Sequence, residues 1–416
     1  MFEKVLLRNA GVPGSERIDV YLSRGGYQAL PQALARTPAE LIDMVKRSGL
    51  RGRGGAGFPS GMKWGFMPTD PAITKYVCVN TDEGEPGTFK DRQLVEQDPH
   101  QVIEGVIITS YAVGAHRAFV YIRGEFFDGM KRWVKAIADA YERGYLGRDI
   151  LGSGYGLDLS VHRGAGAYIC GEETAMIESL EGKRGQPRKK PPFPAQAGLF
   201  GRPTLVHNVE TLCNVPHIVQ RGPEWYAGIG TPKSTGPKIF CVSGHVNRPG
   251  NYELPLGAPL REIIFEHAGG VRGGRAIKAV IPGGSSTPML TPDQLDTPMD
   301  FESLAQAGSM LGTGAVIVIG EGTCMVDVTR RIARFFAHES CGYCAPCRVG
   351  TRRLAETLER VETGQGRPGD LDLLAGLCEG IQGRTFCPLG DAAAAPVRRS
   401  LELFRGEFEA HIRSAC

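Results

Sequence analysis

The chain has 416 residues, enough for two or three domains, and 42% of them are hydrophobic, as in an ordinary globular protein. A formal net charge of +3 gives no indication of binding to nucleic acid or to an anionic membrane. The eleven cysteines are odd in number and mostly scattered, which argues against a disulfide framework and favours a reducing compartment. We find neither a signal-peptide pattern nor an apolar run of roughly 18 residues. We therefore expect a cytoplasmic protein that reaches a membrane only through partner subunits.

The first clear signal along the chain is the start of a helix. Residues 1–37 show little periodicity, so we expect an extended N-terminal arm there. Thr37, Pro38 and Glu40 then occupy the capping, first and third positions of a predicted helix.

A glycine-rich segment, Gly52 to Gly57, follows that helix and contains the pattern G-x-G-x-x-G. An ordinary dinucleotide fingerprint requires a strand before it and a helix after it, so the preceding helix excludes that interpretation. We instead predict a loop whose bare backbone N–H groups admit a phosphate or a flat ring. A flexible turn is the alternative, which the nearby Arg53 and Lys63 disfavour.

Strands then alternate with helices, which predicts an α/β region with a largely parallel sheet covered on both faces. The expected strands are 76–80, 118–122 and 157–161, and the expected helices are 98–113 and 130–141. Three acids, Asp82, Glu83 and Glu85, follow the first strand. Open α/β sheets bind ligands at the carboxyl ends of their strands, although a solvated acidic turn is the alternative.

A second glycine-rich segment follows the third strand and leads into a helix. Glu172 and Glu173 lie in the first turn of that helix, where the helix dipole favours acids, and this alone is a sufficient structural reason for them. Five cations then lie between Lys183 and Lys190, ahead of prolines and Phe193. Such a run is usually a solvated surface, but one held by prolines beside an aromatic ring could bind the phosphates and adenine of a dinucleotide.

The second half of the chain indicates two further domains. We interpret the change in composition at 228–237 as a linker. A hairpin, a short helix and two more strands then suggest a β-grasp domain, and helices dominate the rest. The expected elements are strands 238–244, 250–254, 276–281 and 316–319, and helices 259–267, 326–337, 351–362, 371–381 and 397–413. We place the domains at 1–230, 231–322 and 323–416.

Three cysteines in the last domain, Cys341, Cys344 and Cys347, are two residues apart, so one short segment aims three thiolates at one point. Together with one remote cysteine, this spacing is typical of a [4Fe–4S] cluster, whose four irons each take a thiolate. Structural zinc sites more often pair two Cys-x2-Cys units, which makes zinc the weaker alternative. Cys387, in a loop flanked by glycine and proline, is favoured as the fourth ligand over Cys378, which falls on the apolar face of a helix.

Taken together, these motifs resemble the flavin- and NADH-binding subunit of respiratory complex I, the bacterial F or 51-kDa subunit. The resemblance extends over nearly the whole chain and is carried by the four cysteines and by segments 52–64, 80–87, 164–174, 183–193 and 207–211. It implies a Rossmann-like FMN domain, a β-grasp (ubiquitin-like) domain and an all-α helical bundle that holds a [4Fe–4S] cluster. It also implies oxidation of NADH, because a flavin can accept the two electrons of a hydride and release them singly to a cluster.

The resemblance implies roles for individual residues. The residues expected to bind FMN are Gly52, Arg53, Gly54, Lys63, Asn80, Asp82, Glu83, Gly171, Glu172, Val206, His207, Asn208 and Thr211. The residues expected to bind NADH are Phe58, Lys63, Phe66, Glu85, Glu173, Lys190 and Phe193. Glu85 and Glu173, expected at the nicotinamide end, are the candidate catalytic residues. Family members often have Asn in place of His207, so we expect a backbone contact at that position.

The resemblance also implies an assembly. The expected partners are a thioredoxin-fold [2Fe–2S] subunit (24-kDa or E-type) and a large multi-cluster iron–sulfur subunit (75-kDa or G-type), on the cytoplasmic face of the inner membrane. We expect the electron-input subunit of complex I, an NADH:quinone oxidoreductase. The diaphorase subunit of a soluble NAD-linked hydrogenase or formate dehydrogenase is the alternative with the same chemistry. A zinc-stapled interaction module is the non-enzymatic alternative.

Overall fold

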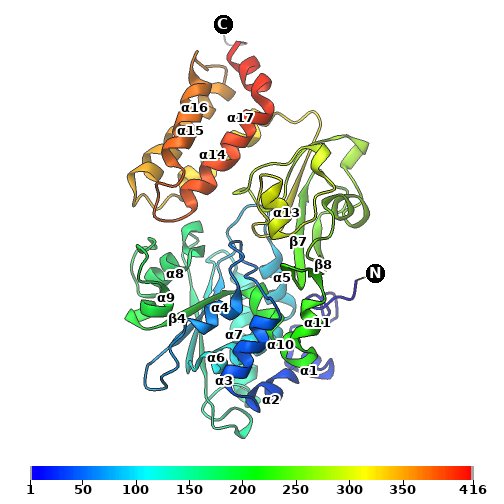
Figure 1. The fold of residues 1–416 in the computed structure, drawn as a ribbon, viewed down its shortest axis with the longest axis vertical. Coiled ribbons are helices and arrows are strands. Elements are labelled where there is room, and N and C mark those ends of the chain that lie inside the picture. The colour runs from blue at the N-terminus through cyan, green and yellow to red at the C-terminus, as the bar shows by residue number, and fades with distance from the viewer. Residues whose placement is uncertain (1, 414–416) are drawn as a thin grey trace.

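The computed structural model describes residues 2–413, which form three regions (Figure 1). An α/β region built around a four-stranded sheet fills the lower half of the view and contains the N-terminal half of the chain. A second four-stranded sheet, coloured green to yellow, lies beside it, and the C-terminal helices form a bundle at the top. None of the described helices is long and apolar enough to cross a membrane.

The first sheet is wholly parallel, with the strand order β3-β2-β1-β4. Its strands are β1 Tyr76–Thr81, β2 Arg117–Ile122, β3 Asp158–Arg163 and β4 Thr204–Asn208. The first three confirm the strands expected from the sequence, and their parallel pairing confirms the predicted type of sheet. The sequence does not indicate β4, because its five residues are almost all buried and lack the alternation that marks a half-buried strand.

The helices around this sheet include two long ones that confirm the expected segments. α6 (Pro99–Val113) is buried on nearly every side and packs against α10 (Val209–Arg221), whereas α7 (Phe127–Glu142) has one apolar face. The helices of this region are α1 Ile18–Ser23, α2 Ala29–Leu34, α3 Pro38–Arg47, α4 Ser60–Gly65, α5 Lys90–Gln97, α6 Pro99–Val113, α7 Phe127–Glu142, α8 Glu173–Leu180, α9 Pro194–Ala197, α10 Val209–Arg221 and α11 Pro223–Ala227. At the start of α3, the Thr37 hydroxyl accepts the N–H of Glu40 at 3.3 Å, which confirms the predicted cap.

The N-terminal segment is more ordered than the extended arm expected from its sequence. It contains α1 and α2, whose six residues each are too few to show a helical period. Val5, Leu6 and Leu7 are buried, and their backbone N–H groups donate to the carboxylate of Glu253 at 2.9, 2.8 and 2.8 Å. Glu253 belongs to the second sheet and is 248 residues away from Val5 in the sequence. Its carboxylate therefore holds residues 5–7 against a strand of that sheet.

The second sheet is mixed, with the strand order β8-β7-β10-β9. β7 pairs antiparallel with β8 and parallel with β10, and β9 pairs antiparallel with β10. These strands confirm the four expected ones: β7 Pro237–Gly244, β8 Gly250–Pro255, β9 Ile277–Ile281 and β10 Ala315–Gly320. The region also contains α12 Leu260–Glu262, continued by a π-helical turn Ile263–His267, and α13 Phe301–Gln306. The expected linker holds a small hairpin of β5 Gly230–Thr231 and β6 Ser234–Thr235.

Four helices form the C-terminal bundle, and all four confirm expected helices. They are α14 Met325–Glu339, α15 Ala345–Glu362, α16 Asp370–Ile381 and α17 Leu389–Arg413. α15 begins earlier than expected, directly after Cys344, because Pro346 is well suited to the first turn of a helix. The three-cysteine segment therefore spans the connection from α14 to α15 and the first turn of α15, and Cys387 lies in the connection from α16 to α17.

We predict that Glu253→Gln loosens the N-terminal segment. The amide keeps the shape of the carboxylate, but it loses the charge and turns one acceptor into a donor that faces an N–H group. Hydrogen-exchange mass spectrometry should show faster exchange at the amides of residues 5–7, and urea unfolding should show a loss of about 1–3 kcal/mol. Glu266→Gln, at an exposed position, is the control. Unchanged exchange at these amides would contradict the prediction.

Candidate functional site

The glycine-rich loop lies between α3 and α4 and rests on the start of α10. The N–H of Arg53 donates to Thr211 Oγ1 at 2.8 Å. A Cβ atom on Gly54 would lie 3.0 Å from Cβ of Asn208, so the loop approaches α10 this closely only because it lacks a side chain there. Gly55 has a φ of 134°, which other residues rarely adopt. The loop therefore presents bare backbone beside a helix N-terminus, an arrangement that suits phosphates and other anions.

The Arg53 side chain is buried beneath this loop. Its Nη2 donates to the Tyr226 hydroxyl at 3.0 Å and to Thr235 O at 2.6 Å. Its Nε and Nη1 have no protein partner among the described residues. The guanidinium thus ties the loop to α11 and to the β5–β6 hairpin, while two of its nitrogens stay unsatisfied by protein atoms.

The loop after β1 contains a buried acid without a protein partner. Asn80 Nδ2 donates to Gly171 O at 2.8 Å, and Asn80 Oδ1 accepts the N–H of Asp82 at 3.0 Å. Both carboxylate oxygens of Asp82 are buried and, within residues 2–413, unpaired. Burial raises the pKa of Asp82 to about 7, against the opposing charge of Arg123. Orphaned buried acceptors are rare, so this carboxylate fits a bound group that supplies hydroxyl or N–H donors, as the ribityl chain of FMN would.

The two other acids of this loop have protein partners. Glu83 accepts two backbone N–H groups at the start of α5, at 2.8 and 3.0 Å, and burial raises its pKa to about 7. Glu85 accepts the Tyr168 hydroxyl at 2.7 Å and the N–H of Ser286 at 2.7 Å, and burial raises its pKa as well. Glu83 therefore supports α5, whereas Glu85 lies where the α/β region meets the loop after β9.

Two lysines from different segments share one carboxylate. Glu173 accepts Lys63 Nζ at 2.8 Å on Oε2 and Lys190 Nζ at 2.7 Å on Oε1. Lys63 also donates to Val206 O at 2.9 Å, and Lys190 also reaches Glu172 at 3.3 Å. Burial alone would raise the pKa of Glu173, but the two cations outweigh it and lower the pKa to about 2. Three of the segments singled out in the sequence therefore meet at this carboxylate.

Polar side chains at the starts of α8 and α10 accept hydrogen bonds from backbone N–H groups of these helices. Glu172 caps α8 by accepting two of its N–H groups at 2.8 and 2.9 Å. Asn208 caps α10 by accepting the N–H of Thr211 at 3.3 Å. His207 accepts the indole N–H of Trp64 at 2.7 Å, and burial lowers its pKa to about 3, so the ring stays neutral. The His207 side chain is thus occupied by protein, and its backbone stays available for a cofactor.

Three exposed phenylalanines lie in these segments. Phe58, Phe66 and Phe193 are 45%, 57% and 53% exposed. Phe58 O accepts the N–H of Gly52 at 2.9 Å, and the ring centroids of Phe58 and Phe66 are 6.2 Å apart. An exposed pair of rings forms an apolar surface that a flat group such as adenine can cover.

The four cysteines expected to bind a cluster lie at one end of the bundle. Cys341, Cys344, Cys347 and Cys387 belong to one group of packed residues, which also includes residues of both sheets. Burial raises the pKa of Cys387 to about 12, and the charges of Glu172 and of the neighbouring thiols add to the effect. The start of α8 is therefore within electrostatic reach of these thiols.

The spacing of the four thiols suits a cluster better than a single ion. Among the described residues, the one group of three or more ligating side chains with ligand atoms within 4.8 Å of one another lies elsewhere. A single zinc ion would hold sulfurs about 3.8 Å apart, whereas a four-iron cluster is a larger body with one thiolate on each iron. Cys378 is fully buried and its Sγ contacts Ala394 O at 3.5 Å, so it is the core residue expected.

Contacts that the sequence does not indicate join the cysteine segment to the α/β region. The guanidinium of Arg184 donates to Cys341 O at 3.2 Å. The backbone N–H of Tyr168 donates to Glu339, 171 residues away, at 3.0 Å. Both Arg184 and Tyr168 lie inside recognised motifs, but partners this distant along the chain leave no local signal.

The sequence also gives no indication of a group of buried charged side chains beneath the site. Lys90 Nζ lies 2.9 Å from both Asp91 and Glu210, and Lys238 Nζ lies 2.7 Å from Glu210. All four side chains are buried. Asn208 donates to Asp91 at 2.7 Å, so this group supports a residue expected to bind the cofactor. Charged residues are usually exposed, and no periodicity marks these as exceptions.

Three models of sequence families match successive parts of the chain. Residues 45–217 match the Nuo51 FMN-binding domain, residues 238–318 match the SLBB domain, and residues 327–411 match the NADH-ubiquinone oxidoreductase-F iron-sulfur binding region. The first and last of these contain the glycine-rich loops and the four cysteines, respectively. The matches therefore agree with the cofactor types that the site geometry suits.

Similar proteins extend the match to almost the whole chain. The NADH-quinone oxidoreductase F subunit numbered 2 in Rhizobium meliloti (strain 1021) is 58% identical over 99% of this chain and 98% of its own length. The NADH-quinone oxidoreductase F subunit of Mycobacterium tuberculosis (strain ATCC 25618 / H37Rv) is 54% identical over 93% of this chain and 88% of its own length. A solved chain of an NAD+-reducing [NiFe]-hydrogenase in the air-oxidized state is 39% identical, with a TM-score of 0.84 over 99% of this chain and 67% of that one. The chain therefore belongs to the family of NADH-quinone oxidoreductase F subunits.

Proposed function

We propose that this chain is the electron-input subunit of complex I, which oxidises NADH with FMN as hydride acceptor and delivers electrons singly, through a [4Fe–4S] cluster, to partner subunits and quinone. One observation carries the proposal: the motif segments around the glycine-rich loops meet the four-cysteine segment through Tyr168–Glu339 and Arg184–Cys341. When bound, FMN supplies the exchange between a two-electron donor and one-electron carriers.

The residues of the chain bind and orient these groups. The FMN residues are Gly52, Arg53, Gly54, Lys63, Asn80, Asp82, Glu83, Gly171, Glu172, Val206, His207, Asn208 and Thr211. Arg53 and Glu83 act there through the loop and through α5, and His207 acts through its backbone. The N-termini of α8 and α10 favour negative charge on a phosphate or on a reduced ring. The unpaired carboxylate of Asp82 accepts hydrogen bonds from the cofactor.

Side chains at the open side of these loops bind NADH. Phe58, Phe66 and Phe193 offer aromatic surface to adenine, and Lys63 and Lys190 offer positive charge to its phosphates. Glu85 and Glu173 face the nicotinamide end and orient it for hydride transfer. Cys341, Cys344, Cys347 and Cys387 are the four ligands of the cluster.

The fold supports a finer assignment. The parallel order β3-β2-β1-β4 supports a Rossmann-like domain at 1–230, and the order β8-β7-β10-β9 around a short helix supports a β-grasp domain at 231–322. The helical bundle then begins at residue 323 and includes the rest of the described chain, to residue 413.

The chain works within an assembly at the cytoplasmic face of the inner membrane. Its partners are a thioredoxin-fold [2Fe–2S] subunit and a large multi-cluster subunit. Tyr343 and Phe386, 53% and 52% exposed with ring centroids 5.2 Å apart, flank the cysteines and offer one of these partners an apolar contact. The hydrogenase likeness is compatible with a second assembly of the same chemistry, but its 39% identity and the 67% of that chain that is covered are lower than the 58% and 98% of the Rhizobium relative.

An anaerobic NADH titration of the full chain, co-expressed with its [2Fe–2S] partner, tests the proposed function. We expect the flavin absorbance to bleach and the EPR signal of a reduced [4Fe–4S] cluster to appear at low temperature. If the cofactors were intact but were reduced by another donor and not by NADH, the assignment of NADH as the substrate would be wrong. A colourless zinc protein would overturn the function.

Replacing Cys387 with Ser should remove the cluster, because one iron loses its thiolate. We expect bound iron to fall from about four atoms per chain to a small fraction of that value, with FMN retained. Cys378→Ser is the matched control, since its small hydroxyl can replace a thiol that contacts Ala394 O. Iron content and EPR measure both variants. If only Cys378→Ser lost the cluster, Cys378 would be the fourth ligand and Cys387 would not.

Lys190→Ala should lower kcat/KM for NADH, measured as reduction of ferricyanide, by about 10- to 100-fold. It removes one of the two cations that hold Glu173 in place, and a tenfold change corresponds to about 1.4 kcal/mol. The neighbouring Lys189 is exposed, so Lys189→Ala is a control expected to stay within about twofold of the wild type. If the two changes lowered kcat/KM equally, the positive charge of residues 183–190 would assist NADH binding without the contact between Lys190 and Glu173, which would contradict the prediction.

A further inference from the structure

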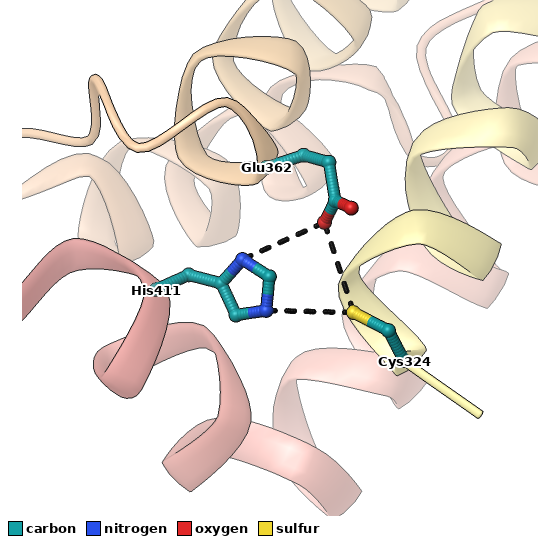
Figure 2. A group of neighbouring side chains, drawn as sticks. All are labelled: Cys324, Glu362 and His411. Atoms are coloured by element: carbon teal, nitrogen blue, oxygen red, sulfur yellow. Dashed lines mark hydrogen bonds and ion pairs between the residues drawn. The ribbon is translucent and has the colours of Figure 1, made fainter. Parts of the chain in front are cut away.

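Three side chains with metal-ligating atoms meet at the end of the bundle opposite the four cysteines. Cys324 directly precedes α14, Glu362 is the last residue of α15, and His411 lies in the last turn of α17. Figure 2 shows the three side chains pointing towards one another from these elements. All three are half-buried, and their ligand atoms lie within 4.8 Å of one another. The proposed electron transfer uses none of them.

The separations of these atoms fit a single tetrahedral ion. Sγ of Cys324 lies 3.7 Å from Oε2 of Glu362 and 3.4 Å from Nε2 of His411. Nδ1 of His411 lies 3.6 Å from the same Oε2. Zn²⁺ binds sulfur at about 2.3 Å and nitrogen or oxygen at about 2.0 Å, so tetrahedral neighbours are about 3.3–3.6 Å apart. With one nitrogen of the ring taken as the ligand, the three ligand atoms lie within 4.8 Å of one another, so shifts of roughly 1 Å would bring them to the edges of one tetrahedral face.

Hydrogen bonding alone accounts less well for this arrangement. The 3.6 Å between Nδ1 and Oε2 is longer than a normal N–H···O hydrogen bond, and a thiol is a weak donor and a weak acceptor, so the contacts of Sγ with Glu362 at 3.7 Å and with His411 at 3.4 Å contribute little. Cysteine, histidine and glutamate are all zinc ligands, and three protein ligands leave a fourth position for water. Because one nitrogen binds the ion, binding requires the His411 ring to turn until that nitrogen faces the space between Sγ of Cys324 and Oε2 of Glu362.

The position of the group separates it from the electron path. α14 has 15 residues and is therefore about 22 Å long, with Cys324 at its start and Cys341 beyond its end. α15 and α17 likewise begin beside cluster cysteines and end beside Glu362 and His411. An ion here would join the ends of three helices whose other ends carry the cluster.

We propose that Cys324, Glu362 and His411 bind one structural Zn²⁺ ion. The thiolate and the carboxylate balance its charge, and the neutral imidazole completes the protein ligands. Because the three residues come together only in the folded bundle, binding of the ion stabilises the packing of α14, α15 and α17.

The test uses the full chain with its flavin and cluster. The dialysed protein is titrated with Zn²⁺ against a chelating indicator, and bound zinc is examined by X-ray absorption at the zinc edge. We expect one equivalent of zinc with a single sulfur ligand, and at least tenfold weaker binding in Cys324→Ser, Glu362→Gln and His411→Ala. Glu356→Gln, on the same helix and exposed, is the matched control for Glu362→Gln and should bind zinc like the wild type.

Iron and flavin contents, measured in every variant, separate loss of zinc from loss of the fold. If Cys324→Ser or His411→Ala loses these cofactors, Glu362→Gln decides, because the amide preserves the shape of the side chain. Zinc bound by four sulfurs, zinc binding unaffected by the three changes, or no zinc binding by the wild type would each overturn the proposal.

Discussion

A buried group of ions fixes the α/β region and the second sheet relative to each other. Glu210, in the first turn of α10, accepts both Lys90 of α5 and Lys238 of β7, and it also accepts the N–H of Ile239 at 2.9 Å. Asp91 accepts the N–H of Glu210 at 3.0 Å. Removal of such charges from water costs several kcal/mol for each ion, so the group is stable only when every member is paired. The group therefore holds the start of α10, against which the glycine-rich loop rests, from both α5 and β7.

Pairing of opposite charges also determines the electrostatics of the open side of the site, where NADH is proposed to bind. A dinucleotide carries negative phosphates, and a free carboxylate at the start of α8 would repel it. Both oxygens of Glu173 are instead paired with Lys63 and Lys190, and Lys190 also pairs with Glu172, so the two lysines balance the charge of the two carboxylates. The low pKa of Glu173 means that it stays ionised throughout the neutral range, so the two lysines stay ordered before any ligand arrives. This pre-organisation reduces the entropy that binding would otherwise lose.

Local signals predicted most of the architecture, whereas contacts distant along the chain had no such signal. The 15 residues of α6, the Thr37 cap and the cysteine spacing are visible because each signal lies within a short stretch of sequence. β4 is invisible because it is buried on both faces. Arg53 and Lys63 look alike in sequence, two cations beside a glycine-rich loop. Only the fold shows that Arg53 is buried against Tyr226, 173 residues away, while Lys63 faces Glu173.

Tyr168 shows how the three regions constrain one another. Its backbone N–H donates to Glu339 of α14, its hydroxyl donates to Glu85, and Glu85 in turn accepts the N–H of Ser286 in the loop after β9. Its ring packs against Phe335 of α14, with centroids 5.1 Å apart. A displacement of the bundle would therefore pull on the acid proposed to face nicotinamide. Tyr168 contacts the bundle and the acidic loop directly, and it reaches the loop after β9 through Glu85, so this one residue restrains the flavin-binding segments and the cysteine segment together.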